Sequence, residues 1–461
     1  MRNTSSKSPR LHRIRPKFPR VNHGARLSVF STSIVLCRNG KKLSFGPGPR
    51  KRRRGFKKDR QGFKDLIESI DAFISNLYNI LDVLATEDIR NELNLIRLEM
   101  VAVTNKIEEL RLLQEAFSAT AGVDSSISTV VSLRILHVNP DAAQVGTAVK
   151  LKPLKWKLLT GVLDPEESST RTIAKYDNAN VFIEWKPFSI PRSVKIDERV
   201  QNLAIFLQAP KERTFRSLNC KGVLEDSGHS RYCFLFQRPE SSPSEVGVPP
   251  RTLLNLLSSS YIPSLTARFR LASQLAHTVL HLHSSGWLHK AIRSDNVLFF
   301  PSESHAPRCL DNPYLMGYEY ARLDSVGELS EKPSNNPDND IYRHPLAQGP
   351  TSSNFTMAFD IYSLGILLYE IAVWRSFKTV VKRLRVSRYS SSEMQKVRNR
   401  IVDAQSSEGL FKDLEFRVGI MYAGAVKVCI GEEFENTNLN PDEFIRLFFE
   451  KVVQTLQKCH A

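Results

Sequence analysis

The chain has 461 residues and a formal net charge of +17, and its 41% hydrophobic and 9% aromatic content is enough for a packed core. Residues 1–60 hold 19 Lys and Arg and a single acid, whereas the rest holds 46 basic and 47 acidic residues. This distribution argues against a nucleic-acid-binding fold with a basic surface throughout. No apolar run reaches the roughly 18 residues of a membrane span.

Residues 1–60 are predicted to form a disordered basic tail, because Arg, Lys, Pro, Ser and Gly dominate and no hydrophobic period is sustained. The cationic run over residues 41–60 is typical of nuclear import signals and of contacts with anionic lipid or nucleic acid. An Arg- and Ser-rich start also fits an organelle transit peptide. The alternatives are a solvated tail and an incorrect gene start.

The six cysteines are scattered and none shows C-x-x-C spacing, so no zinc module or other metal site and no disulfide framework is predicted. Reduced thiols indicate an intracellular protein. The cytoplasm is the expected location, and the basic tail leaves the nucleus or an organelle as alternatives.

Residues 61–120 are predicted to be helical. Apolar side chains recur at spacings of three and four over Phe63–Leu84 and again over Ile89–Phe117, a continuous second helix with Thr86 at its N-cap. Gln114, the one polar residue on the second stripe, either sets the register or marks a fraying end. The coiled-coil-like stripes need a third helix, another domain or another chain, so a protein partner is expected here.

The remaining order of elements predicts an α+β fold. Residues 121–170 are expected to be a linker and entry segment, 171–250 a small β-rich lobe and 251–461 a larger helical lobe. The expected strands are Arg171–Tyr176, Asn180–Lys186 and Arg231–Gln237, and the expected helices are Ile196–Ala209, Thr266–Ser284, Phe359–Val373 and one starting at Asn440-Pro441.

Three segments resemble protein-kinase motifs in the order and spacing of that family. Residues 282–298 (LHSSGWLHKAIRSDNVL) are similar to the catalytic loop H-R-D-L-x-x-x-N, with His289 on its His, Ala291 on the catalytic Asp and Asn296 on the Mg²⁺-binding Asn. Residues 360–365 resemble the helix start that anchors this loop, which implies that Asp360 accepts hydrogen bonds from the loop backbone. Residues 342–345 resemble the end of the activation segment, with Pro345 on the Pro of A-P-E.

The departures from these motifs predict impaired catalysis. Ala291 has no carboxylate to orient a substrate hydroxyl, and Gly317 lies at the place of the Mg²⁺-binding Asp of D-F-G. No G-x-G-x-x-G precedes the strands. Lys186 and Asn296 are the candidates for residual nucleotide contacts, with Glu198 as the partner of Lys186, so ATP is a candidate cofactor without efficient catalysis.

The amino-acid sequence of these motifs resembles that of a fungal kinase-like domain, as in GWLHKAIRSDNVLFF and FDIYSLGILLYEIAVW. That domain is commonly appended to HeLo-type helical domains of prion-inhibition-and-propagation proteins. The resemblance covers about residues 150–460, and residues 61–120 are similar to the later helices of such a bundle. It implies a two-lobed pseudokinase that acts as a signalling or scaffold module in a cell-death or incompatibility pathway.

Two other functions stay open. An atypical active kinase could use Asp295 or Glu319 as the base, and an anionic-surface or nucleic-acid binder could use residues 41–60, which leaves a membrane surface as a partner. His289, Asp360 and Pro345 are expected to be structural.

Overall fold

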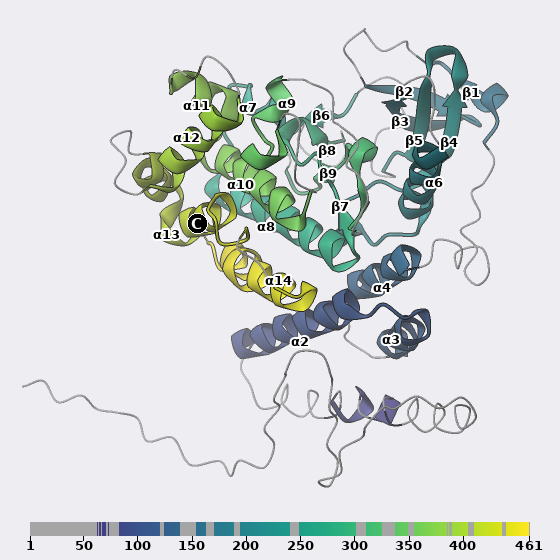
Figure 1. Cartoon of the computed structure of the whole chain (residues 1–461), viewed down its shortest axis with the longest axis horizontal. Helices are drawn as coiled ribbons and strands as arrows, with labels where there is room; N and C mark the ends of the chain where they lie inside the picture. The colour runs from purple at the N-terminus through teal and green to yellow at the C-terminus, as the bar shows by residue number, and fades with distance from the viewer. Residues whose placement is uncertain are drawn as a thin grey trace, which may run out of the picture. The chain divides into compact units, whose positions relative to one another are not determined.

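The structure is a computed structural model of the whole chain. It describes residues 62, 64, 65, 67–70, 72, 83–119, 124–138, 154–162, 170–188, 194–239, 249–300, 310–324, 337–348, 355–384, 386, 390–403, 410–435 and 439–460. The predicted tail, residues 1–60, and most of the helix predicted over Phe63–Leu84 lie outside the described residues. Residues Phe63–Ala461 form one compact unit, which is mixed α and β (Figure 1).

The helix predicted as continuous over Ile89–Phe117 is in fact two helices, α2 (Val83–Val103) and α3 (Ile107–Ala119). Residues 104–106 break it, and α2 begins before Thr86, so that residue is not its N-cap. The break is stabilised from outside, because the buried Arg134 donates to the carbonyls of Ala102 (2.8 Å) and Thr104 (3.2 Å). Arg134 thereby caps the end of α2, which no local signal in that helix indicates.

The expected linker, residues 121–170, contains a buried helix instead, α4 (Ser125–Val138). Nine of its side chains are buried, including Ser126 and Thr129, so it lacks the polar face that makes an amphipathic period visible in a sequence. It is the third helix that the predicted stripes required. Gln114 of α3 donates a 2.8 Å hydrogen bond to Ser132 of α4, so it joins two helices and does not mark a fraying end.

The β-rich lobe is an antiparallel sheet in the order β1-β2-β3-β5-β4. Its strands are β1 (Leu159–Thr160), β2 (Arg171–Tyr176), β3 (Ala179–Pro187), β4 (Cys220–Asp226) and β5 (Arg231–Gln237), with α6 (Val194–Gln208) packed against β4. The predicted β2, β3, β5 and α6 are confirmed, while β4 was missed. Asp177 and Asn178 both have positive φ, as a two-residue hairpin turn requires, and this turn pairs Arg171 with Glu184 across the strands.

The larger lobe is helical. Its helices are α7 (Leu253–Leu257), α8 (Leu265–Ser284), α9 (Pro337–Asp340), α10 (Met357–Val373), α11 (Phe377–Arg383), α12 (Ser391–Val402), α13 (Leu410–Ile430), α14 (Pro441–Phe448) and α15 (Gln454–Gln457), with a π-turn over Phe449–Val453. Short strands β6 (Arg251–Thr252), β8 (Val297–Phe299) and β9 (Tyr314–Leu315) form one small sheet, and β7 (Trp287–Leu288) pairs with β10 (Arg322–Leu323). The predicted N-cap Asn440 is confirmed by a capping box with Glu443.

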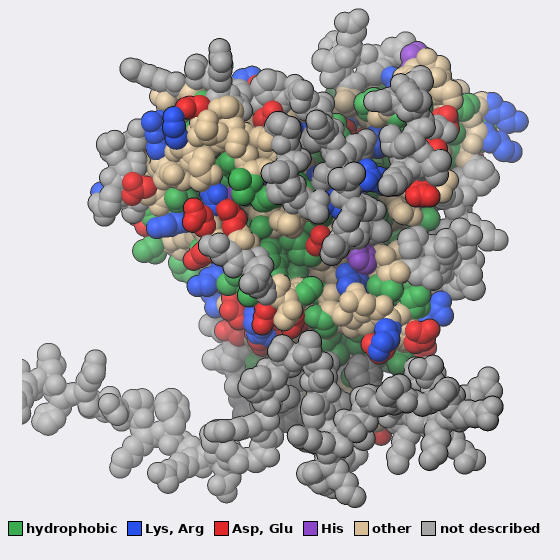
Figure 2. Space-filling view, viewed as in Figure 1, with side chains coloured by type: hydrophobic (Ala, Val, Ile, Leu, Met, Phe, Trp, Pro, Cys, Tyr) green, Lys and Arg blue, Asp and Glu red, His purple; other side chains and the backbone are tan. Residues whose placement is uncertain are grey.

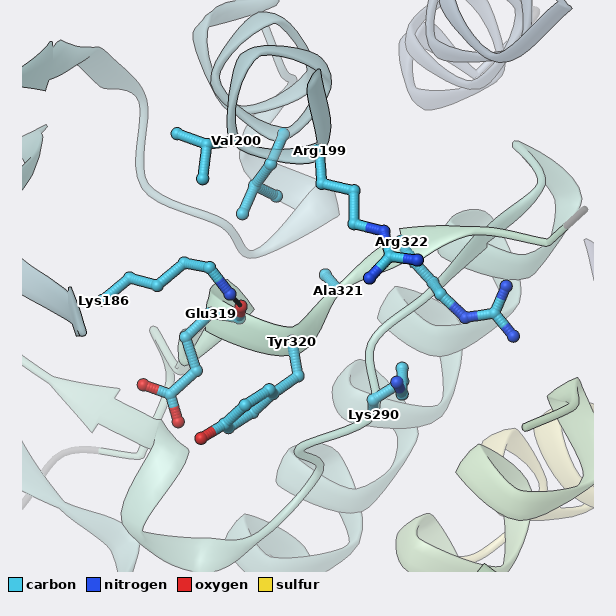
Figure 3. Close-up of a pocket in the computed structure, with 9 residues that line it drawn as sticks. Lys186, Arg199, Val200, Lys290, Glu319, Tyr320, Ala321 and Arg322 are labelled. Atoms are coloured by element: carbon cyan, nitrogen blue, oxygen red, sulfur yellow. Dashed lines mark hydrogen bonds between the residues drawn. The ribbon is translucent and has the colours of Figure 1, made fainter. Parts of the chain in front are cut away.

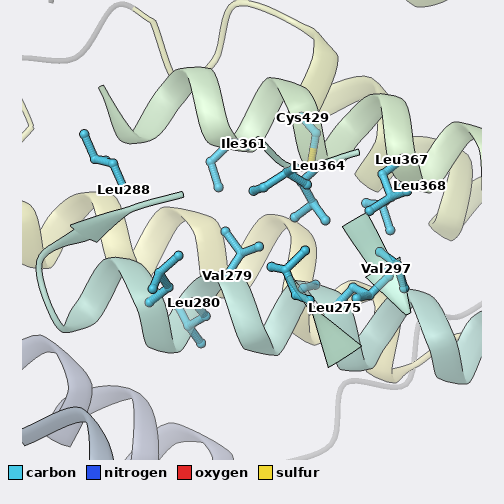
Figure 4. Close-up of a cluster of buried hydrophobic side chains, with 14 of the residues drawn as sticks. Leu275, Val279, Leu280, Leu288, Val297, Ile361, Leu364, Leu367, Leu368 and Cys429 are labelled. Carbon is cyan, nitrogen blue, oxygen red and sulfur yellow. The ribbon is translucent and has the colours of Figure 1, made fainter. Parts of the chain in front are cut away.

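The core of this lobe lies around α10, which packs against α8 and α13. Figure 4 shows Leu275 and Val279 of α8 opposite Ile361 and Leu364 of α10. A Cβ at Gly365 would lie 2.7 Å from the Cβ of Cys429, so only glycine allows α13 to approach α10 this closely. Among the described residues no single helix is long and apolar enough to cross a membrane, although α10 and α11 together meet that test across an 85° bend.

Helices α2, α3 and α4, named here the helical module (residues 83–138), pack on the helical lobe and share its core. In the contact between α2 and α14, Arg446 donates to Glu92 (3.0 Å) and to Glu99 (2.8 Å). Helix α4 packs on α8, and a Cβ at Gly286 after α8 would lie 2.4 Å from the guanidinium of Arg134. Leu95, Leu98 and Val101 of α2 are therefore buried within this chain. The predicted stripe of α2 is only partly covered, because Ile96 and Val103 are 40% and 39% exposed.

Candidate functional site

Asp360, in the first turn of α10, anchors the loop of residues 289–296 by hydrogen bonds to its backbone. Asp360 is fully buried and accepts hydrogen bonds from the backbone N–H groups of His289 (2.7 Å) and Lys290 (2.8 Å). His283 contributes a third contact at 3.3 Å. The contact expected between Asp360 and the loop backbone is thus present, and it holds Lys290 at a φ of +67°.

The loop also closes on itself around Ala291. The amide Nδ2 of Asn296 donates to the Ala291 carbonyl at 2.6 Å, and the Ala291 N–H donates to Nδ1 of His289 at 3.2 Å. Burial lowers the pKa of His289 to about 4, so its ring is neutral and can accept this bond. The loop is thus held by hydrogen bonds within itself and to Asp360, but the side chain of Ala291 offers no base.

A partly buried arginine connects the sheet to this loop. Arg171 of β2 forms an ion pair with Glu184 of β3 at 2.8 Å, and donates to the carbonyl of Asp295 at 2.6 Å and to Oδ1 of Asn296. The side chains of Arg171 and Glu184 are only 18% and 10% exposed. Both polar ends of the Asn296 amide are therefore engaged by protein groups.

Gly317 completes the arrangement. Its φ is +87°, and its N–H donates to both carboxylate oxygens of Glu184, at 3.1 and 3.2 Å. A Cβ at this position would lie 2.2 Å from Nδ2 of Asn296. An aspartate therefore does not fit at the D-F-G position unless Asn296 moves.

Lys186 reaches this region from the end of β3, as Figure 3 shows. It is buried and donates to the backbone carbonyl of Glu319, and its ammonium lies 5.4 Å from the centre of the Tyr320 ring. The expected partner Glu198 is wrong: its side chain is exposed, and the neighbouring Arg199 lines the pocket instead. Figure 3 shows the side chain of Arg199 directed toward Arg322.

The cavity beside Lys186 is very small. Arg199, Lys290, Arg322 and Glu319 also line it, and its volume is about 10 Å³, room for about one water molecule. Burial raises the pKa of Glu319, although the guanidinium of Arg293, 4.0 Å away, opposes that shift. Asp295 is paired with Arg293 at 2.7 Å. This cavity by itself is too small for a nucleotide. Each of the two candidate replacement bases, Asp295 and Glu319, lies beside Arg293.

Comparison with known families gives one match, over residues 208–459, to a family described as Domain of unknown function (DUF7580). The chain belongs to this family. The match includes the loop, Gly317 and Asp360, whereas Arg171, Glu184 and Lys186 precede it. No curated protein matches the chain.

A second buried network in the DUF7580 region anchors Pro345. The carbonyl of Pro345 accepts from Ser391 at 2.7 Å, and the preceding His344 contacts Glu435 at 2.9 Å. Glu435 also pairs with Arg398, which is 2% exposed. Leu346, which follows Pro345, is exposed, and the carboxylate that pairs with the buried Arg398 comes from Glu435, a distant part of the chain.

A third network was missed by sequence reasoning. Glu370 of α10 is fully buried and accepts from the hydroxyl of Tyr342 at 2.7 Å and from the N–H of Phe377 at 2.6 Å. Ser294 contacts the same tyrosine hydroxyl at 2.8 Å. The loop, the segment before Pro345 and α11 thus meet at one carboxyl group. Among the described residues, no group of three or more His, Cys, Asp and Glu could hold a metal ion.

The Glu370 network predicts a pH-dependent stability. Burial raises the pKa of Glu370 from 4.5 to about 7, although its hydrogen bonds to Phe377 and Tyr342 oppose the shift. Between these two values the folded chain binds more protons than the unfolded chain, so this group makes the free energy of unfolding fall as pH rises from about 4.5 to about 7. We expect a loss of about 3 kcal/mol from this residue.

Urea unfolding of the wild type and of Glu370→Gln between pH 4.5 and 8 measures this effect. The glutamine keeps a carbonyl acceptor but does not titrate, so the variant should gain stability relative to the wild type as pH rises, with the gain complete near pH 8. A stability difference that stays constant over this range would contradict the assignment.

Proposed function

We propose that this chain is a kinase-like pseudoenzyme, with a β-rich and a helical lobe corresponding to those of a protein kinase, that works by binding and not by phosphoryl transfer. The proposal rests first on the motif order and on the loop held by Asp360. It rests next on Ala291 and Gly317, which place no carboxylate where the base and the Mg²⁺ ligand of a kinase would be.

The observation that carries the proposal is the bridge from Arg171 to Asn296. Phosphoryl transfer depends on positioning and on charge stabilisation by bound metal ions. Here the guanidinium of Arg171 takes the amide oxygen that a cation would need, and the buried Glu184 is already paired with the same arginine. The site is closed by its own side chains.

The role in signalling is the part that the resemblance suggests: a scaffold or signalling module in a fungal cell-death or incompatibility pathway. In this proposal the partner is another protein. Helices α2 and α4 pack on α8 and α14, whereas Ile96 and Val103 of α2 are exposed, so a partner would bind this open part of the helical module or another surface of the chain.

Thermal denaturation with ATP and Mg²⁺ tests the proposal. No stabilisation is expected at 1 mM nucleotide, whereas a ligand present at 100 times its Kd would add about 2.7 kcal/mol. A radiolabelled-ATP assay should show no Mg²⁺-dependent transfer. Transfer that is abolished in Lys186→Met but kept in Lys157→Met, a change at an exposed lysine, would overturn the proposal.

A further inference from the structure

The first half of α13 has one buried face and one exposed face. Phe411, Leu414 and Val418 are buried and pack on the core. Asp413, Phe416 and Arg417 follow at the spacing i, i+3 and i+4, which places them on one face of this half of the helix, away from the core. Ile420 follows the break in the helix at Gly419.

This outer face is apolar and open. Phe416 is 91% exposed and Ile420 is 74% exposed, and Met421 beside them is 43% exposed. Figure 2 shows hydrophobic side chains at the surface among acidic and basic ones, on the side where Figure 1 places α13. Phe416 contributes little to the fold at that exposure, so its large ring is a candidate contact for another molecule.

The charged residues on the outer face of α13 favour a second copy of the same helix as the partner. Asp413 and Arg417 lie one turn apart and form an exposed ion pair at 2.8 Å. If a second copy of α13 lies antiparallel across a two-fold axis, Asp413 of each copy meets Arg417 of the other, and the apolar residues of the two copies meet between them. The face is complementary to itself.

We propose that two copies of this chain associate through a two-fold contact of the outer face of α13, centred on Phe416. Gly419, with a φ of +77°, breaks α13 after this face, and the exposed Ile420 and Met421 follow the break directly. The two charge pairs fix the antiparallel direction, while the rings and aliphatic side chains provide the buried apolar area.

Sedimentation velocity of the full chain over 1–100 µM tests this contact. The wild type should dimerise, and Phe416→Ser should raise the dissociation constant about tenfold or more, as expected when a central aromatic contact is removed. Ile262→Ser removes a matched side chain, 67% exposed and outside α13, and should leave the dissociation constant unchanged. A wild type that stays monomeric at 100 µM, or equal effects of the two variants, overturns the proposal.

Charge reversal tests the two-fold geometry itself. Asp413→Arg gives a face with two positive charges and Arg417→Asp a face with two negative charges, so each variant alone should dimerise more weakly than the wild type. An equimolar mixture of the two should form a heterodimer, and the double variant D413R/R417D should recover the wild-type behaviour. A mixture that associates no better than the separate variants would exclude the antiparallel pairing.

Discussion

Replacing Arg171 by Met should lower the free energy of unfolding by about 3 kcal/mol, because Glu184 then remains buried without its cationic partner. The same change frees Oδ1 of Asn296, so hydrogen exchange of residues 289–296 should become faster. Urea unfolding and amide exchange measure the two effects. The expected loss is large because the pair is nearly buried.

Two variants separate the ion pair from other causes. In Arg171→Met with Glu184→Gln, the amide is neutral and can still accept from the Gly317 N–H, so most of the lost stability should return. Arg270→Met breaks a pair of similar length, 2.9 Å with Asp311, whose side chains are 58% and 43% exposed, and should lower stability by less than about 1 kcal/mol. Equal losses in Arg171→Met and in the double variant would show that the buried charge is not the cause.

Gly317→Ala should lower the free energy of unfolding by about 3 kcal/mol, since the new Cβ would lie 2.2 Å from the Asn296 amide and the backbone would stay left-handed. Gly161→Ala is the matched control, because its φ is +64° and no atom lies within 4 Å of its Cβ position. The control should lose about 1 kcal/mol, from the backbone alone.

Asn296→Ala removes the atoms that would clash, so the effect of Gly317→Ala should be smaller in that background, as a double-mutant cycle measures. Equal losses at Gly161 and Gly317 would contradict the steric argument. By the same argument, Gly317→Asp should not create a Mg²⁺ site, and thermal denaturation of this variant should be unchanged by Mg²⁺.

Part of the site could have been found in the sequence. The two-residue turn at Asp177 and Asn178 fixes the register of the hairpin, and that register alone pairs Arg171 with Glu184. An opposite-charge pair on two strands of a predicted lobe was therefore a readable signal. The contact of Arg171 with Asn296 could not be predicted in this way, because 125 residues separate the two and no local pattern joins them.

Other features depended on tertiary packing from the start. Helix α4 is buried too completely to show a period, and the break after α2 is stabilised by Arg134, about 30 residues later. The choice of Glu198 failed for a related reason. A helix can be predicted from its apolar spacing, but its rotation against the sheet decides whether residue 198 or residue 199 lines the cavity beside Lys186.

By itself the sequence determined the α+β order of elements and the strands β2, β3 and β5, because these follow from local spacing and residue type. Only the tertiary structure decided that the helical module shares the core and that Arg171 closes the site on Asn296. The physical reason is that a buried charged or polar group costs free energy unless it is paired, and the groups that pair with these side chains lie far away in the sequence.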